Sequence, residues 1–492
     1  MVHAATSADI RAELDHPVID VDGHLQEVTP LFRDEVFERA RELGGPRLAE
    51  RVAATPLTYD EGAKWRWFEL TEEQRRDEWA VCPAWWTMPT DARDRATAYL
   101  PALLHERLAE MGIDFSVLYP SLGLSLPAIR DEEVRRLACR VYNDFNAELY
   151  RPYADRLTPA AILPTTTPAE AIDELDHAVL EAGAKAVTIG HVRRAVPRVT
   201  REAPGATDLA LRLDTYGIDS AYDYDPFWRR CEELGVAVGV HASDQAWGSR
   251  RSISLYAYNH IGCFSAAGES LCKALFLGGV TARFPKLRFA FLEGGAGWAC
   301  SLFADLVGHW HKRNGASIRS LDPARLDLDE MAGLFDRHGP ERLRRDPALV
   351  RAFFGRPEPH PAELDDFAAA SIDRLEDFGA RFVVPFFFGC EADDPLNAWA
   401  FAGQVNPLAA RLQVVFGSDI GHWDVPELDG VLREAYELVE RGVLDATDFR
   451  DFVFTHPVRL YASGNPGFFD GTACEAAASA LLADQCRSAA RP

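Results

Sequence analysis

The sequence predicts an α/β protein built as a distorted (β/α)8 barrel, or TIM barrel, with long helical insertions after the first strand and between the sixth and seventh. Three observations predict it: eight short apolar runs rich in β-formers, helical patterns between many of them, and ionisable residues at several run ends. Most runs are continuously apolar, which is typical of strands covered on both faces. The predicted strands are Val18–Asp20, Phe115–Tyr119, Thr158–Leu163, Ala184–Ile189, Val236–His241, Leu287–Glu293, Arg381–Phe388 and Leu412–Ser418.

Helical patterns separate these runs. Asp131–Tyr150 spaces its apolar residues at three and four, as one face of a helix requires. Pro168–Ala182 follows the third run and ends before Gly183, a residue suited to a C-cap. Pro226–Leu234 precedes the fifth run and Leu428–Arg441 follows the eighth. The alternation of strands and helices favours a parallel barrel, whose site lies at the carboxyl ends of the strands.

The spacing of the runs is uneven, so residues 1–492 are predicted to form one barrel domain with insertions. An insertion or cap over residues 28–110 contains many tryptophans, which would either line an aromatic-accepting pocket or form a local core. Residues 314–380 are charged and helical in pattern, and residues 472–492 form an Ala-rich tail. The five tryptophans of the first insertion are Trp65, Trp67, Trp79, Trp85 and Trp86.

The composition limits the possible partners. Lys and Arg total 52 against 76 Asp and Glu, a net charge of −24, which argues against nucleic acid and anionic membranes. Nine cysteines form no C-x-x-C pair, and we find neither a signal-peptide core nor a membrane-spanning stretch. We therefore expect a cytoplasmic protein with reduced thiols. A small anionic substrate needs only a few local cations and remains compatible with this charge.

The first run ends in Asp-x-Asp-Gly-His. Because strand side chains alternate, Asp20, Asp22 and His24 are expected to project from the same face. Two buried carboxylates and an imidazole need a partner, and a divalent cation is one. The alternative is a polar strand end in which Asp22 caps a turn beside Gly23.

Three other runs also end in ionisable residues: His241, Glu293 and Asp419. Each taken alone has an ordinary explanation, such as a core histidine or a helix cap. Together at one end of a barrel, these residue types suit zinc, manganese, magnesium or iron. We predict that Asp22, His24, His241 and Asp419 hold one divalent ion and leave a position for water or substrate.

Further residues are candidates for supporting roles. His422 would act with Asp419, and Asp20 and Asp424 would support the ligands from outside, although Asp424 could instead cap the final helix. Substrate-binding candidates follow the fourth and fifth runs, where solvated loop charges are the alternative; they are His191, Arg193, Arg194 and His260. The pair His309 and His311 is predicted to lie on the surface, away from the site.

Five segments resemble the amidohydrolase superfamily, in the branch of aminocarboxymuconate-semialdehyde decarboxylase. They are IDVDGHLQE (19–27), VGVHASD (238–244), GGVTARFPKLRFAFLEGGAGW (278–298), FGSDIGHWDVPE (416–427) and HPVRLYASGNPGFFDG (456–471). The resemblance implies a distorted barrel with one catalytic divalent metal. It matches Asp22 and His24 to the ligands on strand one, His241 to the ligand on strand five and Asp419 to the aspartate on strand eight.

Two positions depart from the commoner pattern of that superfamily. Asp22 stands where the first histidine of His-x-His is usual, which favours a harder metal. Glu293 replaces a frequent histidine on strand six, which bears on the choice of reaction. Lys185 lies at the beginning of strand four and not at its end, where a lysine bridging two metals would be needed, so a single ion is expected.

The favoured reaction is nonoxidative decarboxylation of a small aromatic or unsaturated acid, with Asp419 delivering a proton to carbon. The alternative is hydrolysis of an amide, ester, lactone or C–C bond, with Asp419 or Glu293 as general base. A third hypothesis is a barrel that only binds a ligand. We expect one divalent metal ion as cofactor, zinc first, with manganese or iron as alternatives, and a homodimer or higher homo-oligomer.

Overall fold

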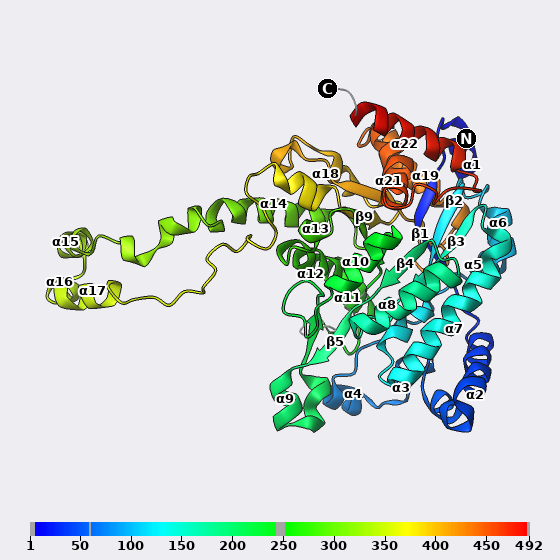
Figure 1. Cartoon of the computed structure of the whole chain (residues 1–492), viewed down its shortest axis with the longest axis horizontal. Coiled ribbons are helices and arrows are strands. Elements are labelled where there is room, and N and C mark those ends of the chain that lie inside the picture. The colour runs from blue at the N-terminus through cyan, green and yellow to red at the C-terminus, as the bar shows by residue number, and fades with distance from the viewer. Residues whose placement is uncertain (1–4, 59–60, 243–250, 490–492) are drawn as a thin grey trace.

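A computed structural model describes residues 5–58, 61–242 and 251–489 of the chain. Eight parallel strands follow one another around a barrel in the order β1-β2-β3-β4-β7-β8-β9-β10 (Figure 1). The strands are β1 (Ile19–Leu25), β2 (Phe115–Pro120), β3 (Leu157–Ile162), β4 (Ala186–Ile189), β7 (Val238–Val240), β8 (Phe289–Phe291), β9 (Phe386–Cys390) and β10 (Gln413–Phe416). The predicted (β/α)8 fold is therefore confirmed.

The first and last strands lie together and nearly close the barrel. The backbone N–H of Asp419 donates to the carbonyl oxygen of Asp22 at 2.9 Å. The buried carboxylate of Asp20 joins three strand segments, because it accepts hydrogen bonds from Ser116 Oγ at 2.7 Å and from both the Oγ (2.7 Å) and the N–H (3.0 Å) of Ser418. These bonds fix the end of β1 against β2 and β10, where the ionisable residues begin.

The four predicted helical segments are helical in the structure. Around the barrel lie α7 (Glu132–Tyr150), α8 (Pro168–Asp176) with a π-turn at His177–Glu181, α10 (Asp225–Leu234), α11 (Tyr256–His260), α12 (Cys263–Leu277), α13 (Val280–Arg283), α14 (Gly297–Arg313), α18 (Asn397–Phe401) and α19 (Val431–Glu440), the last preceded by a 3-10 turn at Leu428–Gly430. The chain then continues through α20 (Ala446–Arg450), a π-turn at Asp451–Thr455, α21 (His456–Ala462) and α22 (Glu475–Ala489), while α1 (Ser7–Glu13) precedes β1.

The seventh strand was predicted too early. Arg381–Phe388 was expected to be extended, but Gly379–Val383 forms a π-helical turn and β9 begins only at Phe386. The apolar run Phe382–Cys390 thus covers two conformations, which hydrophobicity alone does not distinguish. Pro385 lies at the junction, and its carbonyl oxygen accepts a hydrogen bond from the N–H of Phe289 on β8 at 2.9 Å. The later boundary leaves Glu391 as the first residue after the strand.

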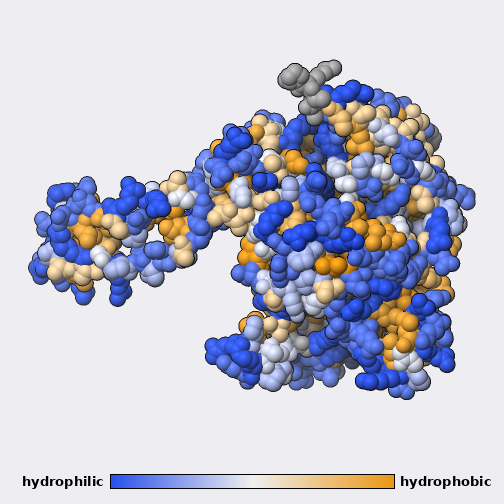
Figure 2. Space-filling model, in the orientation of Figure 1, coloured by the Kyte–Doolittle hydropathy of each residue, from blue (hydrophilic) through white to orange (hydrophobic). Residues whose placement is uncertain are grey.

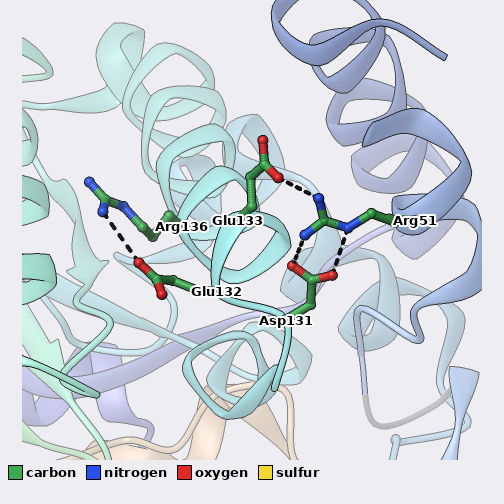
Figure 3. Close-up of a pocket in the computed structure, with 5 residues that line it drawn as sticks. All are labelled: Arg51, Asp131, Glu132, Glu133 and Arg136. Carbon is green, nitrogen blue, oxygen red and sulfur yellow. Dashed lines mark hydrogen bonds and ion pairs between the residues drawn. The ribbon is translucent and has the colours of Figure 1, made fainter. Parts of the chain in front are cut away.

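The segment between β1 and β2 is helical. It contains α2 (Thr29–Ala54), kinked at Gly45 where φ is +66°, and then α3 (Ala63–Glu69), α4 (Glu72–Glu78), α5 (Ala92–Tyr99) and α6 (Pro101–Arg107). Arg51 ties α2 to the start of α7, where its guanidinium reaches Asp131 and Glu133 (Figure 3). Beside it, Arg136 pairs with Glu132 at 3.7 Å. These charges satisfy one another and hold the segment against the barrel.

Two further features depart from a plain barrel. An unpredicted antiparallel hairpin, β5 (Val192–Ala195) with β6 (Leu211–Asp214), stands between β4 and β7, with α9 (Pro197–Glu202) at its far end. The segment between α14 and β9 extends well away from the barrel and has α15 (Leu328–His338), α16 (Glu341–Arg344) and α17 (Pro347–Phe354) at its tip (Figure 1). In the described part of the chain, no helix combines the length and apolar character needed to cross a membrane.

Candidate metal centre

The carboxyl ends of four strands bring the predicted ligands together. Asp22 and His24 lie on β1, His241 follows β7, and Asp419 follows β10; all four are at least 96% buried. Glu293, which follows β8, reaches the same place. Ligand atoms of Asp22, His24 and His241 lie within 4.8 Å of one another, and so do those of a second group formed by His24, Glu293, Asp419 and His422. His24 belongs to both groups, so the two form one cluster.

Two imidazole rings meet at their edges in this cluster, with an angle of 79° between their planes. The Nε2 atoms of His24 and His241 are 3.1 Å apart. If both rings carried their proton on the other nitrogen, two lone pairs would point at one another in a buried site. A shared cation removes this conflict, because neutral imidazole nitrogens are good ligands for zinc and similar metals.

Carboxylate oxygens surround the two imidazole nitrogens. Glu293 Oε1 lies 3.1 Å from His24 Nε2 and 3.4 Å from His241 Nε2, and Asp22 Oδ1 lies 3.7 Å from each. Asp419 Oδ1 is 3.4 Å from His24 Nε2. Within the described residues, none of these three oxygens accepts a hydrogen bond of acceptable geometry. Buried carboxylate oxygens without donors require a compensating charge, and a divalent cation fits this set of ligand atoms.

The charges of the cluster shift the pKa values of its members in different directions. Burial opposes the charged form of His241, but the adjacent Glu293 and Asp22 raise the pKa of its imidazole. Burial raises the pKa of Asp22 and Asp419 well above the usual value, and the charge of Glu293 adds to both effects. Burial acts on Glu293 too, but the adjacent His241 and His24 hold its pKa well below the usual value. Burial, reinforced by His422, lowers the pKa of His24 to about 3. A neutral His24 among several carboxyl groups is the protonation state that a metal ligand needs.

The backbone at two of these positions is unusual. Glu293 and Asp419 have φ angles of +54° and +48°, the left-handed region that non-glycine residues seldom adopt. Such conformations cost on the order of 1–3 kcal/mol and persist where the surrounding structure enforces them. Here they occur directly after β8 and β10, and they place both carboxyl groups in the cluster.

The hydroxyl of Ser121, a residue that the sequence did not single out, lies between His24 and His422. Ser121 Oγ lies 3.3 Å from His24 Nδ1 and 3.1 Å from His422 Nε2, and Gln26 Nε2 donates to it at 2.9 Å. The Nδ1 atom of His422 is 2.5 Å from Asp419 Oδ1. Ser121 therefore fixes the orientation of both rings. His422 makes the contact with Asp419 that its predicted supporting role needs.

A cavity of about 1520 Å³ opens from the cluster, larger than the ~300–1,000 Å³ of common ligand pockets. One wall is aromatic: Phe264 packs against His241 and His260, and Trp423 packs against His260 and Tyr256, with ring centroids 5.5–6.2 Å apart. Trp67 also lines the cavity, whereas the other four tryptophans of its insertion are 50–87% exposed. The cavity thus offers an aromatic surface beside the cluster.

All four predicted substrate-binding residues line this cavity, but their surroundings differ. Arg194 is committed to the hairpin, since it pairs with the buried Asp214 and donates to Tyr224 Oη at 3.0 Å. Both ring nitrogens of His191 are buried without a partner among the described residues, and burial, together with Arg193, lowers its pKa to about 4. His260 belongs to the aromatic wall.

Glu391 is a further cavity residue that the sequence analysis missed. It lines the cavity directly after β9, and burial, together with Asp424 and Glu293, raises its pKa to about 7. Asp424 also lines the cavity and has a buried Oδ1 without a hydrogen-bond partner in the described chain. A correctly placed seventh strand would have revealed Glu391 as another carboxyl group at a strand end.

Two other predictions concern residues outside the cluster. His309 and His311 are exposed on α14, as predicted. Lys185 precedes β4, and its Nζ donates to the carbonyl oxygen of Phe468 at 2.8 Å. Lys185 is thus bonded away from the cluster and does not stand where a lysine bridging two metal ions would be needed.

Fold and site together define a parallel (β/α)8 barrel with a histidine and carboxylate cluster at the carboxyl ends of its strands. A family model described as amidohydrolase matches residues 59–344, more than half of the chain. The protein belongs to the amidohydrolase family, and the resemblance predicted from the sequence is confirmed. Among the curated proteins compared with it, none matches this chain.

Several solved structures are similar to this chain at low sequence identity. An amidohydrolase from Mycobacterium avium subsp. paratuberculosis K-10 is 18% identical with a TM-score of 0.49, over 91% of this chain and 98% of that one. The 2,6-dihydroxybenzoate decarboxylase from Rhizobium is 15% identical with a TM-score of 0.47 and the same coverages. A dihydroxybenzoic acid decarboxylase from Polaromonas sp. JS666 with bound manganese and 2-nitroresorcinol is 15% identical with a TM-score of 0.48, over 91% of this chain and 97% of that one.

Proposed function

We propose that this amidohydrolase-family protein is a mononuclear metal-dependent enzyme that decarboxylates an aromatic or unsaturated carboxylic acid without oxidation. The observation that carries the proposal is a buried cluster of imidazole and carboxyl groups in which one oxygen each of Asp22, Glu293 and Asp419 has no hydrogen-bond donor among the described residues. It lies at one end of a cavity with an aromatic wall.

Asp22, His24, His241 and Asp419 would hold the ion, and Glu293 Oε1 is close enough to share in this role. Zinc is our first choice because of the two imidazoles, and manganese or iron would suit the three carboxylates. When bound, the ion would supply Lewis-acid attraction for the substrate carboxylate and a neighbouring oxygen.

The reaction requires a proton at carbon. When the C–C bond to the carboxylate breaks, carbon dioxide leaves and the electron pair remains on the ring or alkene carbon. Asp419 is the proposed proton donor, because its carboxyl group reaches the cluster from the end of β10 and lies against His422, from which it could receive a proton. His422, with Nδ1 at 2.5 Å from Asp419 Oδ1, would return a proton to it between turnovers.

The cavity walls would orient the substrate. Phe264, His260 and Trp423 offer ring surfaces for stacking against an aromatic or conjugated acid. Arg193 and the unpartnered ring nitrogens of His191 would receive polar substituents further from the cluster. Arg194 would act mainly by holding the hairpin in place.

One observation favours a second candidate function, hydrolysis of an amide, ester, lactone or C–C bond. Glu293 is an ionised carboxylate 3.1 Å and 3.4 Å from the two ligand histidines, where it could take a proton from an attacking water. Hydrolysis incorporates oxygen from water into the product, whereas decarboxylation does not.

We also propose that the protein acts in the cytoplasm and associates with copies of itself. The cysteine side chains that the structure describes are free thiols, most of them buried, which supports a reducing compartment.

The first test is metal content by mass spectrometry of protein purified without added metal. About one zinc, manganese or iron per chain is expected in the wild type, and its loss is expected in Asp22→Ala/His241→Ala. His309→Ala/His311→Ala is the matched control, since it removes two exposed histidines and should keep the metal. A wild type that neither contains nor accepts metal would contradict both reactions and leave a ligand-binding barrel.

The second test separates the two reactions. Metal-loaded protein is incubated with a panel of hydroxybenzoic and unsaturated acids, and with amides, esters and lactones, in ¹⁸O-labelled water. Carbon dioxide release without label in the remaining organic product supports decarboxylation. Label in an acid product, without carbon dioxide, supports hydrolysis instead.

A further inference from the structure

A buried carboxylate, Glu27, lies three residues after His24 and takes no part in the proposed chemistry. Hydrophilic residues cover much of the molecular surface seen in Figure 2, but Glu27 is only 8% exposed, and a carboxylate at this depth needs hydrogen-bond donors. Its Oε2 accepts a hydrogen bond from the N–H of Leu122 at 2.8 Å. Its Oε1 accepts from the N–H of Gly123 at 2.9 Å and from Tyr142 Oη at 2.7 Å. These bonds join the end of β1 to the chain that follows β2.

Two of the three donors belong to the first turn of a 3-10 helix, Leu122–Ala128, which follows β2. The first N–H groups of a helix have no partner within it, and a carboxylate is a strong acceptor for them. Gly123 leaves room for this contact, because a Cβ there would lie 2.8 Å from Glu27 Oε1 and 2.7 Å from Tyr142 Cε2. Glu27 therefore sets the position of the backbone directly after β2.

Ser121 immediately precedes this helix, and its hydroxyl reaches the metal centre. Ser121 Oγ lies 3.3 Å from His24 Nδ1 and 3.1 Å from His422 Nε2. Gln26, the neighbour of Glu27, donates from Nε2 to the same hydroxyl at 2.9 Å. Two successive side chains at the end of β1 thus hold Ser121, one through its hydroxyl and the other through the backbone that follows it.

The hydroxyl of Ser121 can serve the two rings in only one way at a time. It has one proton and two lone pairs, and Gln26 Nε2 occupies one lone pair. Ser121 Oγ therefore gives its proton to one ring and accepts a proton from the other, so each ring is held in a single tautomer. When His24 serves as a ligand through Nε2, its Nδ1 carries the proton and donates to Ser121. Ser121 then donates to His422 Nε2, and His422 presents its Nδ1–H to Asp419 Oδ1 at 2.5 Å.

We propose that Glu27 is a positioning residue of the metal centre and acts through Ser121 on the rings of His24 and His422. By holding the backbone after β2, it keeps the hydroxyl between the two rings. The hydroxyl in turn sets which nitrogen of His24 is left to bind a metal and which nitrogen of His422 carries the proton that faces Asp419. This inference rests on the proposed metal centre but not on the choice between decarboxylation and hydrolysis.

The first test is ¹⁵N NMR of the full-length protein labelled in its histidine rings, with and without zinc. The signals of His24 and His422 are identified by their loss in His24→Gln and His422→Gln. In the wild type each ring should show the chemical shifts of one tautomer. Ser121→Ala and Glu27→Gln should both give a mixture, because the hydroxyl is absent in one variant and displaced in the other.

Mixed tautomers in the wild type, or unchanged rings in Glu27→Gln, overturn the inference. The zinc-free spectrum needs no metal. A protein that binds no metal would therefore contradict the proposed function, while its spectra would still decide the role of Glu27.

The second test is a double-mutant cycle on zinc affinity, measured by competition with a chelating dye. Ser121→Ala and Glu27→Gln should each lower the affinity about 10-fold, as expected for residues that orient metal-binding histidines. Because Glu27 acts through Ser121, the double variant should lose no more than the more severe single variant. Independent losses that add up to about 100-fold would show that Glu27 acts by another route and would overturn the inference.

Glu174→Gln is the matched control for the loss of a buried carboxylate. Glu174 is 3% exposed and accepts hydrogen bonds from Asn143 Nδ2 and Arg140 Nε, both at 2.7 Å, between α7 and α8. Its replacement should lower stability in urea, as Glu27→Gln does, but leave zinc affinity and ring tautomers unchanged. Gly123→Ala displaces the Glu27 carboxylate without removing a charge, and it takes the place of Glu27→Gln if that variant does not fold. Normal rings and zinc affinity in Gly123→Ala also overturn the inference.

Discussion

At Asp419, burial, like charge and backbone conformation all act on one side chain. The residue is 4% exposed, its carboxyl group is repelled by the charges of Glu293 and Asp424, and its backbone φ is +48°. Without a cation each of these effects is unfavourable. A bound divalent ion would offset the repulsion, so the same features that destabilise the residue in isolation make it a strong ligand.

Asp419→Asn should therefore weaken metal binding and, at the same time, stabilise the metal-free protein. Asparagine keeps the shape and tolerates the left-handed backbone, but it removes the charge. We expect metal affinity and turnover to fall at least ~100-fold, while the metal-free variant unfolds with a free energy ~1–2 kcal/mol higher than metal-free wild type. Urea unfolding and metal titration measure the two quantities. The exposed Glu427→Gln should change neither, and a metal-free Asp419→Asn that is less stable than wild type contradicts the account.

The raised pKa of Glu391 predicts how the stability of the protein depends on pH. Burial first, then Asp424 and Glu293, raises its pKa from 4.5 to about 7. A raised carboxyl pKa contributes stability that is fully present below about pH 4.5 and is lost as the pH rises through 7. Glu391→Gln should therefore match wild type at pH 4.5 and exceed its unfolding free energy by ~1–2 kcal/mol at pH 8.5, after discounting for partial exposure.

Calorimetry at those two pH values checks the prediction for Glu391. The control is Glu440→Gln, an exposed residue on α19, which should give the same small difference from wild type at both pH values. If Glu391→Gln destabilises the protein at pH 8.5, then the carboxylate has a favourable partner in the cavity and the sign of the effect is wrong.

At the scale of elements, the β5–β6 hairpin depends on one buried ion pair. Asp214 is fully buried, pairs with Arg194, and accepts hydrogen bonds from Ser220 Oγ at 2.9 Å and from the N–H of Tyr216 at 3.1 Å. Removing one partner of a buried pair leaves the other charge uncompensated. The hairpin carries Arg193 and lies beside His191, so its position determines the outer part of the cavity.

Asp214→Ala should therefore destabilise the hairpin by ~3–5 kcal/mol. The Arg198–Glu202 pair on α9 is exposed, and breaking it with Glu202→Ala should cost under ~1 kcal/mol. Hydrogen exchange of the amides at 192–195 and 211–214 gives the local opening free energy in both variants. Equal protection in the two variants would mean that the buried pair does not hold the hairpin.

Much of the order of strands and helices could be predicted from local sequence patterns. Continuous apolar runs located all eight barrel strands, and polar residues at their ends predicted Asp22, His24, His241 and Asp419, because both signals are carried by neighbours in the sequence. The hairpin strands, Val-Arg-Arg-Ala and Leu-Arg-Leu-Asp, are short and polar, and only tertiary contacts such as Arg194–Asp214 stabilise them. Ser121 reaches the cluster through β2, 97 residues after His24, a relation that no local pattern contains.

At the scale of the whole molecule, the cluster links β1, β7, β8 and β10 through one point. A ligand that binds only the folded state stabilises it, by about 4 kcal/mol when its concentration is 1,000 times Kd. The same ion would relieve the repulsion among the buried carboxylates. We therefore expect metal binding to affect global unfolding and not only activity.

Chelation should lower the melting temperature of the purified protein by several degrees, and one equivalent of the metal found in the native protein should restore it. Asp22→Ala/His241→Ala, already without metal, is the matched control and should not respond to the chelator. Differential scanning calorimetry measures both. An unchanged melting temperature in chelator-treated wild type, with metal loss verified, would show that the ion does not support the fold.

The segment between α14 and β9 leaves the barrel and returns to it at nearly the same place, because its two ends are held together by Trp310 and Arg313. The strands on either side, β8 and β9, pair directly, with Phe289 opposite Phe386, and this pairing does not involve the segment. Shortening the segment would thus remove no strand pairing of the barrel. Its length and sequence are therefore free to vary without disturbing the strand ends that carry the cluster.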